Sequence, residues 1–168
     1  MISLNQKETS LLQDLKKHEE LCIKKYDSYA SQASDTQLNQ LLTTQGQQEQ
    51  QHLNSINQIL AGQLPATGGQ QQGGQQNTQQ QGQQQGAQGK QSFPPIQPGN
   101  PSAQADTVMC EDLLSTEKYV SSTYNTAIFE FRDPGIRQVL NHIQKEEQQH
   151  GEGLYAYMAS HGMYQAPQ

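Results

Sequence analysis

The residues most able to do chemistry form the pattern Glu-x-x-His, which occurs twice, as Glu49 with His52 and as Glu147 with His150. Residues three apart share one face of an α-helix, so each copy directs a carboxylate and an imidazole toward the same point. Hard carboxylate oxygens combined with imidazole nitrogens suit iron, manganese or zinc. The pattern therefore predicts metal binding, provided that helices carry the two copies and bury them together.

Both copies lie inside an internal repeat. Sliding the sequence on itself by about 98 positions aligns the two halves without a gap, and a repeat of this length is a structural unit used twice. Besides the Glu-x-x-His residues, the matched pairs are Asp14 and Asp112, Leu15 and Leu113, Glu19 and Glu117, Tyr26 and Tyr124, Asp35 and Asp133, and Leu42 and Leu140.

Each half predicts two helices, because its apolar and ligand-type residues recur at alternating steps of three and four. The resulting buried faces run over residues 12–33 and 38–59 in the first half and over 110–131 and 136–157 in the second. Such faces are typical of helices in a bundle.

The ends of these helices carry recognisable signals. Asp35 and Asp133 are expected N-caps, because a carboxylate there accepts from free amides of the first turn, and Pro134 suits a first helical turn. Gly62 and Gly162 follow the second helix of each half, where a left-handed residue is expected.

Two hairpins of this kind predict a four-helix bundle. We expect a first hairpin at residues 1–61, a Gln-, Gly- and Pro-rich linker without fixed structure at 62–105, and a second hairpin at 106–164 that packs with the first as one domain. A linker this long can run the length of the bundle, which allows the second and third helices to be parallel. The predicted class is an all-α, ferritin-like four-helix bundle made of two repeated helical hairpins joined by a long disordered crossover.

Every buried face carries one glutamate at a matching height. With the two histidines, the predicted metal ligands are Glu19, Glu49, His52, Glu117, Glu147 and His150. One glutamate from each of two helices and a Glu-x-x-His from each of the other two is the ligand set of dinuclear carboxylate bundles. Four buried ionised carboxylates repel one another, and two divalent cations would cancel that charge. We expect two divalent metal ions, iron or manganese, with zinc as a further candidate.

Other readings of these residues stay open. The same groups would also suit a partly wet polar core, a bundle rotated so that they face water, or a metal that only stabilises the fold. Gln45 and the tyrosines Tyr26 and Tyr124 lie one step away and are candidates to hydrogen-bond the ligands.

The remaining cysteines and histidines have simpler explanations. Cys22 is expected to fill the core as a small buried thiol, although it lies one turn from Glu19. His18 and His142 fall off the buried faces and are expected to be solvated, and His161 is expected to cap the last helix.

Composition narrows the class of protein. The apolar fraction of 32% and mean hydropathy of −0.90 would suggest disorder, but the Gln-rich segment depresses both averages. The net charge of −6 argues against a nucleic-acid partner. No apolar run reaches membrane length, the first residues lack the apolar core of a signal peptide, and two cysteines fit a reducing interior. We therefore expect synthesis in the cytoplasm and no membrane partner.

Several segments resemble the coat F family of spore coat proteins from endospore-forming Firmicutes. They are Leu-Ser-Thr-Glu-Lys-Tyr at residues 114–119, Ser-Ser-Thr-Tyr-Asn-Thr-Ala at 121–127, and the stretch at 143–152 that contains the second Glu-x-x-His. The resemblance is best over 106–164. It implies a ferritin-like bundle located in the spore coat, with other spore coat proteins as partners. A second copy of the chain is a further candidate partner.

The resemblance also bears on what the chain does. It implies a structural or assembly role in the coat, where Gln–Lys cross-linking would use exposed glutamines and Lys90. The competing hypothesis is a di-iron or di-manganese oxidase, or a catalase-like peroxide scavenger, with Glu19 and Glu117 as terminal ligands and Glu49 and Glu147 as bridges. Related ferritin-like groups, the rubrerythrins and manganese catalases, use ligands at all six positions. The extra carboxylate and the Cys-x-x-Cys motif of peroxide-reducing rubrerythrins are absent here.

Overall fold

The computed structural model describes residues 2–65 and 101–164, and within these ranges the protein is built of α-helices without strands. The helices are α1 (Gln6–Gln32), α2 (Thr36–Leu60), α3 (Pro101–Ile128) and α4 (Pro134–Ser160). The predicted all-α class is confirmed.

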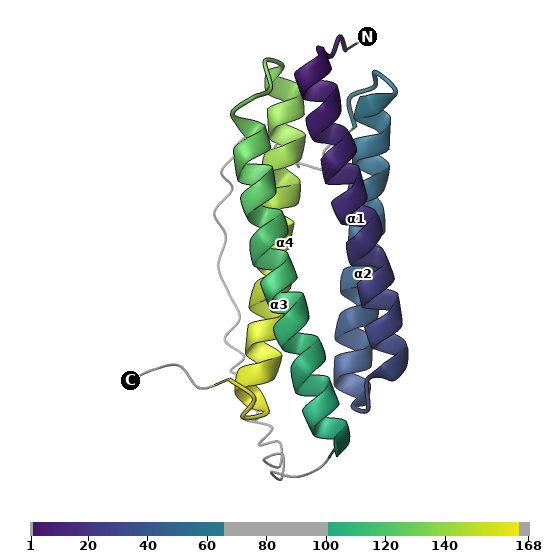
Figure 1. The fold of residues 1–168 in the computed structure, drawn as a ribbon, viewed down its shortest axis with the longest axis vertical. Coiled ribbons are helices and arrows are strands. Elements are labelled where there is room, and N and C mark those ends of the chain that lie inside the picture. The colour runs from purple at the N-terminus through teal and green to yellow at the C-terminus, as the bar shows by residue number, and fades with distance from the viewer. Residues whose placement is uncertain (1, 66–100, 165–168) are drawn as a thin grey trace, which may run out of the picture.

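The helices form two hairpins that pack side by side (Figure 1). α1 packs against α2 in the first hairpin and α3 against α4 in the second, and the hairpins meet where α1 contacts α3 and α2 contacts α4. α2 ends and α3 begins at opposite ends of the bundle, so these two helices run parallel (Figure 1). The structure thus has the parallel arrangement that the length of the linker allows.

Local signals at the helix ends explain where the helices begin and stop. The Asp35 carboxylate accepts from the backbone N–H of Gln37 at 3.0 Å, and the Asp133 carboxylate accepts from that of Gly135 at 2.7 Å. Gly62 and Gly162 have φ values of 78° and 69°, which a residue with a Cβ atom adopts only at a cost. The predicted caps and left-handed helix ends are confirmed.

The start of α3 differs from the expected boundary. The helix begins at Pro101, inside the range 62–105 that we assigned to an unstructured linker. Proline is favoured at the first position of a helix, so the residue that suggested a loop begins the helix instead. The disorder predicted for the linker and the cross-linking role of Lys90 concern residues 66–100, which lie outside the described part of the chain.

The core consists of two apolar zones separated by a polar band at mid-bundle. Fully buried aliphatic residues fill the zones, including Leu12, Leu15, Ile56, Ile59, Ile136 and Leu140 toward one end and Leu38, Leu42, Leu113 and Leu154 toward the other. Each such side chain stabilises the fold by about 1.5–3 kcal/mol relative to its exposure in water. None of the helices described, in 2–65 or 101–164, is both long and apolar enough to span a membrane.

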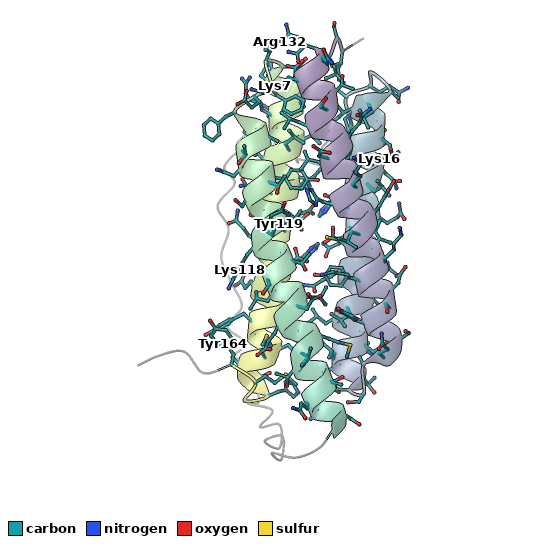
Figure 2. All side chains as sticks on the ribbon, viewed as in Figure 1. Lys7, Lys16, Lys118, Tyr119, Arg132 and Tyr164 are labelled. Carbon is teal, nitrogen blue, oxygen red and sulfur yellow. The ribbon has the colours of Figure 1, made fainter. Side chains whose placement is uncertain are left out.

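An ion pair joins the two hairpins at the end of the bundle where α1 begins. The Arg132 guanidinium donates to the Glu8 carboxylate through Nε at 3.2 Å and through a terminal nitrogen at 3.2 Å. Glu8 also accepts from the backbone N–H of Asn5 at 2.8 Å, which completes a capping box at the start of α1. Figure 2 shows Arg132 and Lys7 together at this end. The Arg132 guanidinium holds the pKa of Glu8 at about 2.

Candidate metal centre

The structure brings all six predicted ligands together in the polar band. α1 supplies Glu19, α2 supplies Glu49 and His52, α3 supplies Glu117, and α4 supplies Glu147 and His150. None of these residues is more than 2% exposed, so the side chains lie between the four helices rather than on the surface. The alternative of a bundle rotated so that these residues face water is therefore excluded.

The ligand atoms form two overlapping groups. In each group four side chains place one oxygen or nitrogen atom within 4.8 Å of the others. The groups are Glu19, Glu49, His52 and Glu147, and Glu49, Glu117, Glu147 and His150. Because Glu49 and Glu147 belong to both, they have the position expected of bridging carboxylates, while each remaining residue belongs to one group.

Both imidazoles direct the Nδ1 atom toward these carboxylates. His52 Nδ1 lies 3.1 Å from Glu147 Oε1 and 3.5 Å from Glu49 Oε2. His150 Nδ1 lies 2.9 Å from Glu49 Oε1 and 3.7 Å from Glu147 Oε2. The two rings stack with centroids 5.7 Å apart. The matching contacts show that the internal repeat produces an approximate two-fold symmetry at the centre.

The other ring nitrogens have partners that sequence reasoning missed. His52 Nε2 lies 2.9 Å from Glu146 Oε2, and His150 Nε2 lies 3.1 Å from Gln48 Oε1. Both partners come from the opposite hairpin and immediately precede a ligand glutamate. A hydrogen bond of this kind orients a metal-binding imidazole and raises its basicity. Gln48 and Glu146 occupy equivalent positions in the repeat, and this match was the one indication in the sequence that both could contact the histidines.

Two tyrosines donate hydrogen bonds to Glu19 and Glu117, the two glutamates that each belong to only one ligand group. The Tyr26 hydroxyl donates to Glu117, and the Tyr124 hydroxyl donates to Glu19. Each bond again crosses between hairpins, and the predicted role of the tyrosines is confirmed. Gln45 behaves differently, because its amide donates to the backbone carbonyl of His150 at 2.9 Å rather than to a ligand side chain.

Unpartnered polar atoms concentrate at this centre. In the described part of the chain, the buried side-chain atoms without a hydrogen bond belong to the predicted ligands, apart from Gln45 Oε1. They are Glu19 Oε2, Glu49 Oε2, His52 Nδ1, Glu117 Oε2 and both oxygens of Glu147. His52 Nδ1 lies at ion-pair distance from several carboxylates, but not in hydrogen-bond geometry. Since native proteins rarely leave buried polar atoms unpaired, the cluster fits a group that takes several ligands at once.

Burial and the two imidazoles shift the pKa values of the four carboxyl groups at the centre. Burial raises the pKa of Glu117 to about 8 and that of Glu19 well above its ordinary value. Burial opposes ionisation of Glu147 as well, but the imidazoles of His150 and His52 hold its pKa at about 2. The pKa of Glu49 is lowered for the same reason.

The imidazole pKa values shift in the complementary direction. Burial disfavours the imidazolium form, but the surrounding carboxylates raise the pKa of His150 to about 11 and that of His52 further. Without a metal, burial thus favours the neutral form of Glu19 and Glu117, while the surrounding carboxylates favour the imidazolium form of both histidines. Two divalent cations would balance four carboxylates beside neutral imidazoles, so the donor set fits a dinuclear centre by charge and by chemistry.

The two cysteines, Cys22 and Cys110, and the remaining histidines lie outside the centre. Cys22 is buried in the core as expected, and burial raises the pKa of its thiol above the ordinary range. His142 is half-exposed, as expected, whereas His18 is partly buried beside the Tyr119 ring, with centroids 5.4 Å apart. His161 is the C-cap of α4, which confirms its predicted role.

A cavity of about 560 Å³ opens between α3 and α4 and reaches the centre. Its lining residues are Leu114, Glu117, Lys118, Ser121, Glu147, Gln148, Gly151, Glu152, Tyr155 and Tyr164. Figure 2 shows the labelled side chains of Lys118 and Tyr164 on the same side of the bundle. The cavity therefore extends from the surface of the second hairpin to Glu117 and Glu147, whose unpaired carboxylate oxygens lie buried behind its inner wall.

The second hairpin also carries the similarity to known proteins. Residues 105–167 match the Coat F domain, a range that includes the ligands Glu117, Glu147 and His150. No curated protein and no solved structure matches the chain. The resemblance of the segments at 114–119, 121–127 and 143–152 to the coat F family of spore coat proteins is thereby confirmed, because residues 105–167 carry a Coat F domain.

Proposed function

We propose that this protein is a structural component of the bacterial spore coat and that its helical bundle holds two divalent metal ions. The Coat F domain supports the location in the coat. The metal centre is supported above all by the six buried candidate ligands, five of which have unpartnered atoms at mid-bundle. The metal would tie all four helices together and so stabilise the domain for a structural role.

The overlap of the two ligand groups supports a role for each residue. Glu49 and Glu147 would bridge the two ions, because both residues belong to both groups. Glu19 and His52 would complete the coordination of one ion, and Glu117 and His150 that of the other. Carboxylates with one imidazole per ion favour iron or manganese, with zinc as a further candidate.

The metal content of the purified protein tests the centre. Protein expressed with iron or manganese should contain two ions per chain by elemental analysis, and a Glu49→Ala/Glu147→Ala variant should contain none. A Glu20→Ala/Glu111→Ala variant is the matched control, because it also removes two carboxylates but leaves the buried groups intact. A wild-type protein without metal after loading with each candidate ion would overturn the metal centre.

The location of the protein during sporulation tests the role in the coat. A fluorescent fusion expressed in an endospore-forming host should collect at the surface of the forespore and remain with the coat fraction of purified spores. A fusion that stays diffuse throughout sporulation would contradict the structural role, whatever its metal content.

The cavity beside Glu117 and Glu147 favours a second candidate function, an oxidase or a catalase-like peroxide-scavenging enzyme. A pair of iron or manganese ions supplies redox chemistry toward dioxygen or peroxide. The tyrosine and imidazole hydrogen bonds would then fix the carboxylates during turnover. Metal-loaded protein that consumes peroxide, beside a Glu49→Ala/Glu147→Ala variant that does not, would establish the enzyme; loaded protein without turnover would leave the structural role.

A further inference from the structure

The two hairpins differ in how they cover the centre, although the ligands match. On the second hairpin, the cavity between α3 and α4 is lined at its inner end by Glu117 and Glu147. Helix packing normally fills such space with side chains. The opening therefore has to be explained by the residues around it.

Gly151 accounts for the opening on α4. It follows His150 directly and lines the cavity. A Cβ atom added at this glycine would lie 3.6 Å from Leu114 Cδ1 and 3.9 Å from Glu117 Cβ, which are ordinary packing distances. A larger side chain at this position would therefore extend into the cavity beside Glu117 without a backbone clash.

The equivalent positions in the first hairpin carry large side chains. Gly151 aligns with Leu53, and the cavity residue Ser121 aligns with Ile23. Leu53 and Ile23 are both partly buried on their helices. By the symmetry of the repeat, we expect these side chains to cover Glu19 where the corresponding cavity lies beside Glu117.

The lining of the cavity suits a positively charged solute. Glu152 lies exposed on the surface and lines the cavity, and Glu117 and Glu147 lie at the buried end. Among the described residues that line the cavity, three have carboxyl groups and one, Lys118, has an ammonium group. The exposed carboxylate of Glu152 attracts a cation to the cavity and raises its local concentration, and Glu117 and Glu147 offer oxygen ligands at the inner end.

We infer that the cavity between α3 and α4 is the passage by which divalent metal ions enter and leave the buried centre, and that the first hairpin is closed to them. This inference rests on the proposed metal centre, because it assigns the route to that centre. Both ions enter from the side of Glu117, Glu147 and His150. The ion held by Glu19 and His52 is then the inner of the two.

Filling the passage without removing a ligand tests this route. Gly151→Leu and Ser121→Ile give the second hairpin the residues of the first, and Leu is a better helix former than Gly. The uptake of cobalt(II) by metal-free protein can be followed by the visible absorption of bound cobalt. Uptake by the double variant should be about tenfold slower than by wild type, because the added side chains raise the free-energy barrier to metal entry. Both proteins should still bind two ions at equilibrium and melt at similar temperatures.

Gln149→Leu is the matched control, because it adds the same side chain to an exposed position of α4 outside the cavity. It should load at the wild-type rate, whereas Glu152→Gln should load more slowly at low ionic strength. A double variant that binds two ions at the wild-type rate would overturn the passage alone. A wild-type protein that takes up no cobalt would overturn the metal centre together with the passage.

Discussion

The first and second hairpins place equivalent ligands at the centre but surround them differently. Glu19, Glu49 and His52 match Glu117, Glu147 and His150 in sequence and in position. The hydrogen-bond partners of the two imidazoles do not match. The His52 imidazole contacts the carboxylate of Glu146, whereas the His150 imidazole contacts the amide of Gln48. The residues proposed to hold two ions are thus matched in the two halves, whereas the groups that would set the affinity and access of each ion differ.

The largest effect should separate bridging ligands from ligands of one group. Glu147→Ala should remove both ions, because Glu147 belongs to both ligand groups, whereas Glu117→Ala should leave one ion per chain. Elemental analysis after dialysis gives the number of ions, and Glu111→Ala provides an exposed control on α3. Equal losses in the Glu147 and Glu117 variants would contradict the shared position of Glu147.

The next effect should come from the partners of the imidazoles. Glu146→Gln should weaken the ion beside His52 by roughly 10- to 100-fold, because outer partners contribute that much to metal affinity. Gln48→Glu should tighten the ion beside His150. Isothermal titration with manganese measures both affinities, and the double exchange should reverse their order. If neither manganese affinity changed with either substitution, the difference between the two imidazole partners would have no effect on metal binding.

Substituting the two tyrosines tests a property in which the two halves should be equal, the stability that each tyrosine hydrogen bond contributes. Tyr26→Phe and Tyr124→Phe each leave a buried carboxylate oxygen without its donor, which costs about 1–3 kcal/mol. Urea unfolding should give similar losses for the two variants, and none for Tyr119→Phe, because Tyr119 is 62% exposed. A loss confined to one variant would mean that the symmetry does not extend to these hydrogen bonds.

The smallest effect concerns the contact between hairpins at Glu8. The folded pKa of about 2 lies below the ordinary value of 4.5, so ionised Glu8 stabilises the fold above the ordinary value, and this contribution is lost as the pH falls toward 2. Urea unfolding should find Glu8→Gln less stable than wild type at pH 6, with the difference shrinking below about pH 4. A difference that is constant with pH would contradict an ionic role for Glu8.

Much of this architecture could be predicted because helical periodicity and the repeat constrain the same residues. The alternating steps of three and four gave the buried faces, and the matched spacing of Glu19 to Glu49 and Glu117 to Glu147 gave a common height in both hairpins. The six residues that meet at mid-bundle therefore followed from the sequence. So did the tyrosine contacts, since both rings lie on those faces.

The remaining features depend on packing between hairpins, which a pattern within one helix does not contain. The contact of His52 with Glu146 requires the rotation of α2 against α4, and Glu146 has no distinctive spacing of its own. The cavity beside Gly151 depends on what is missing between α3 and α4 rather than on a motif. The start of α3 at Pro101 was not predicted, because the residues around it have the composition of a linker.

Anomalous scattering from crystals grown with manganese tests the central claim most directly. Two peaks are expected in the polar band, one near Glu19 and His52 and one near Glu117 and His150, with Glu49 and Glu147 beside both. An empty polar band in crystals of the manganese-loaded protein, or manganese bound only at the surface, would contradict it.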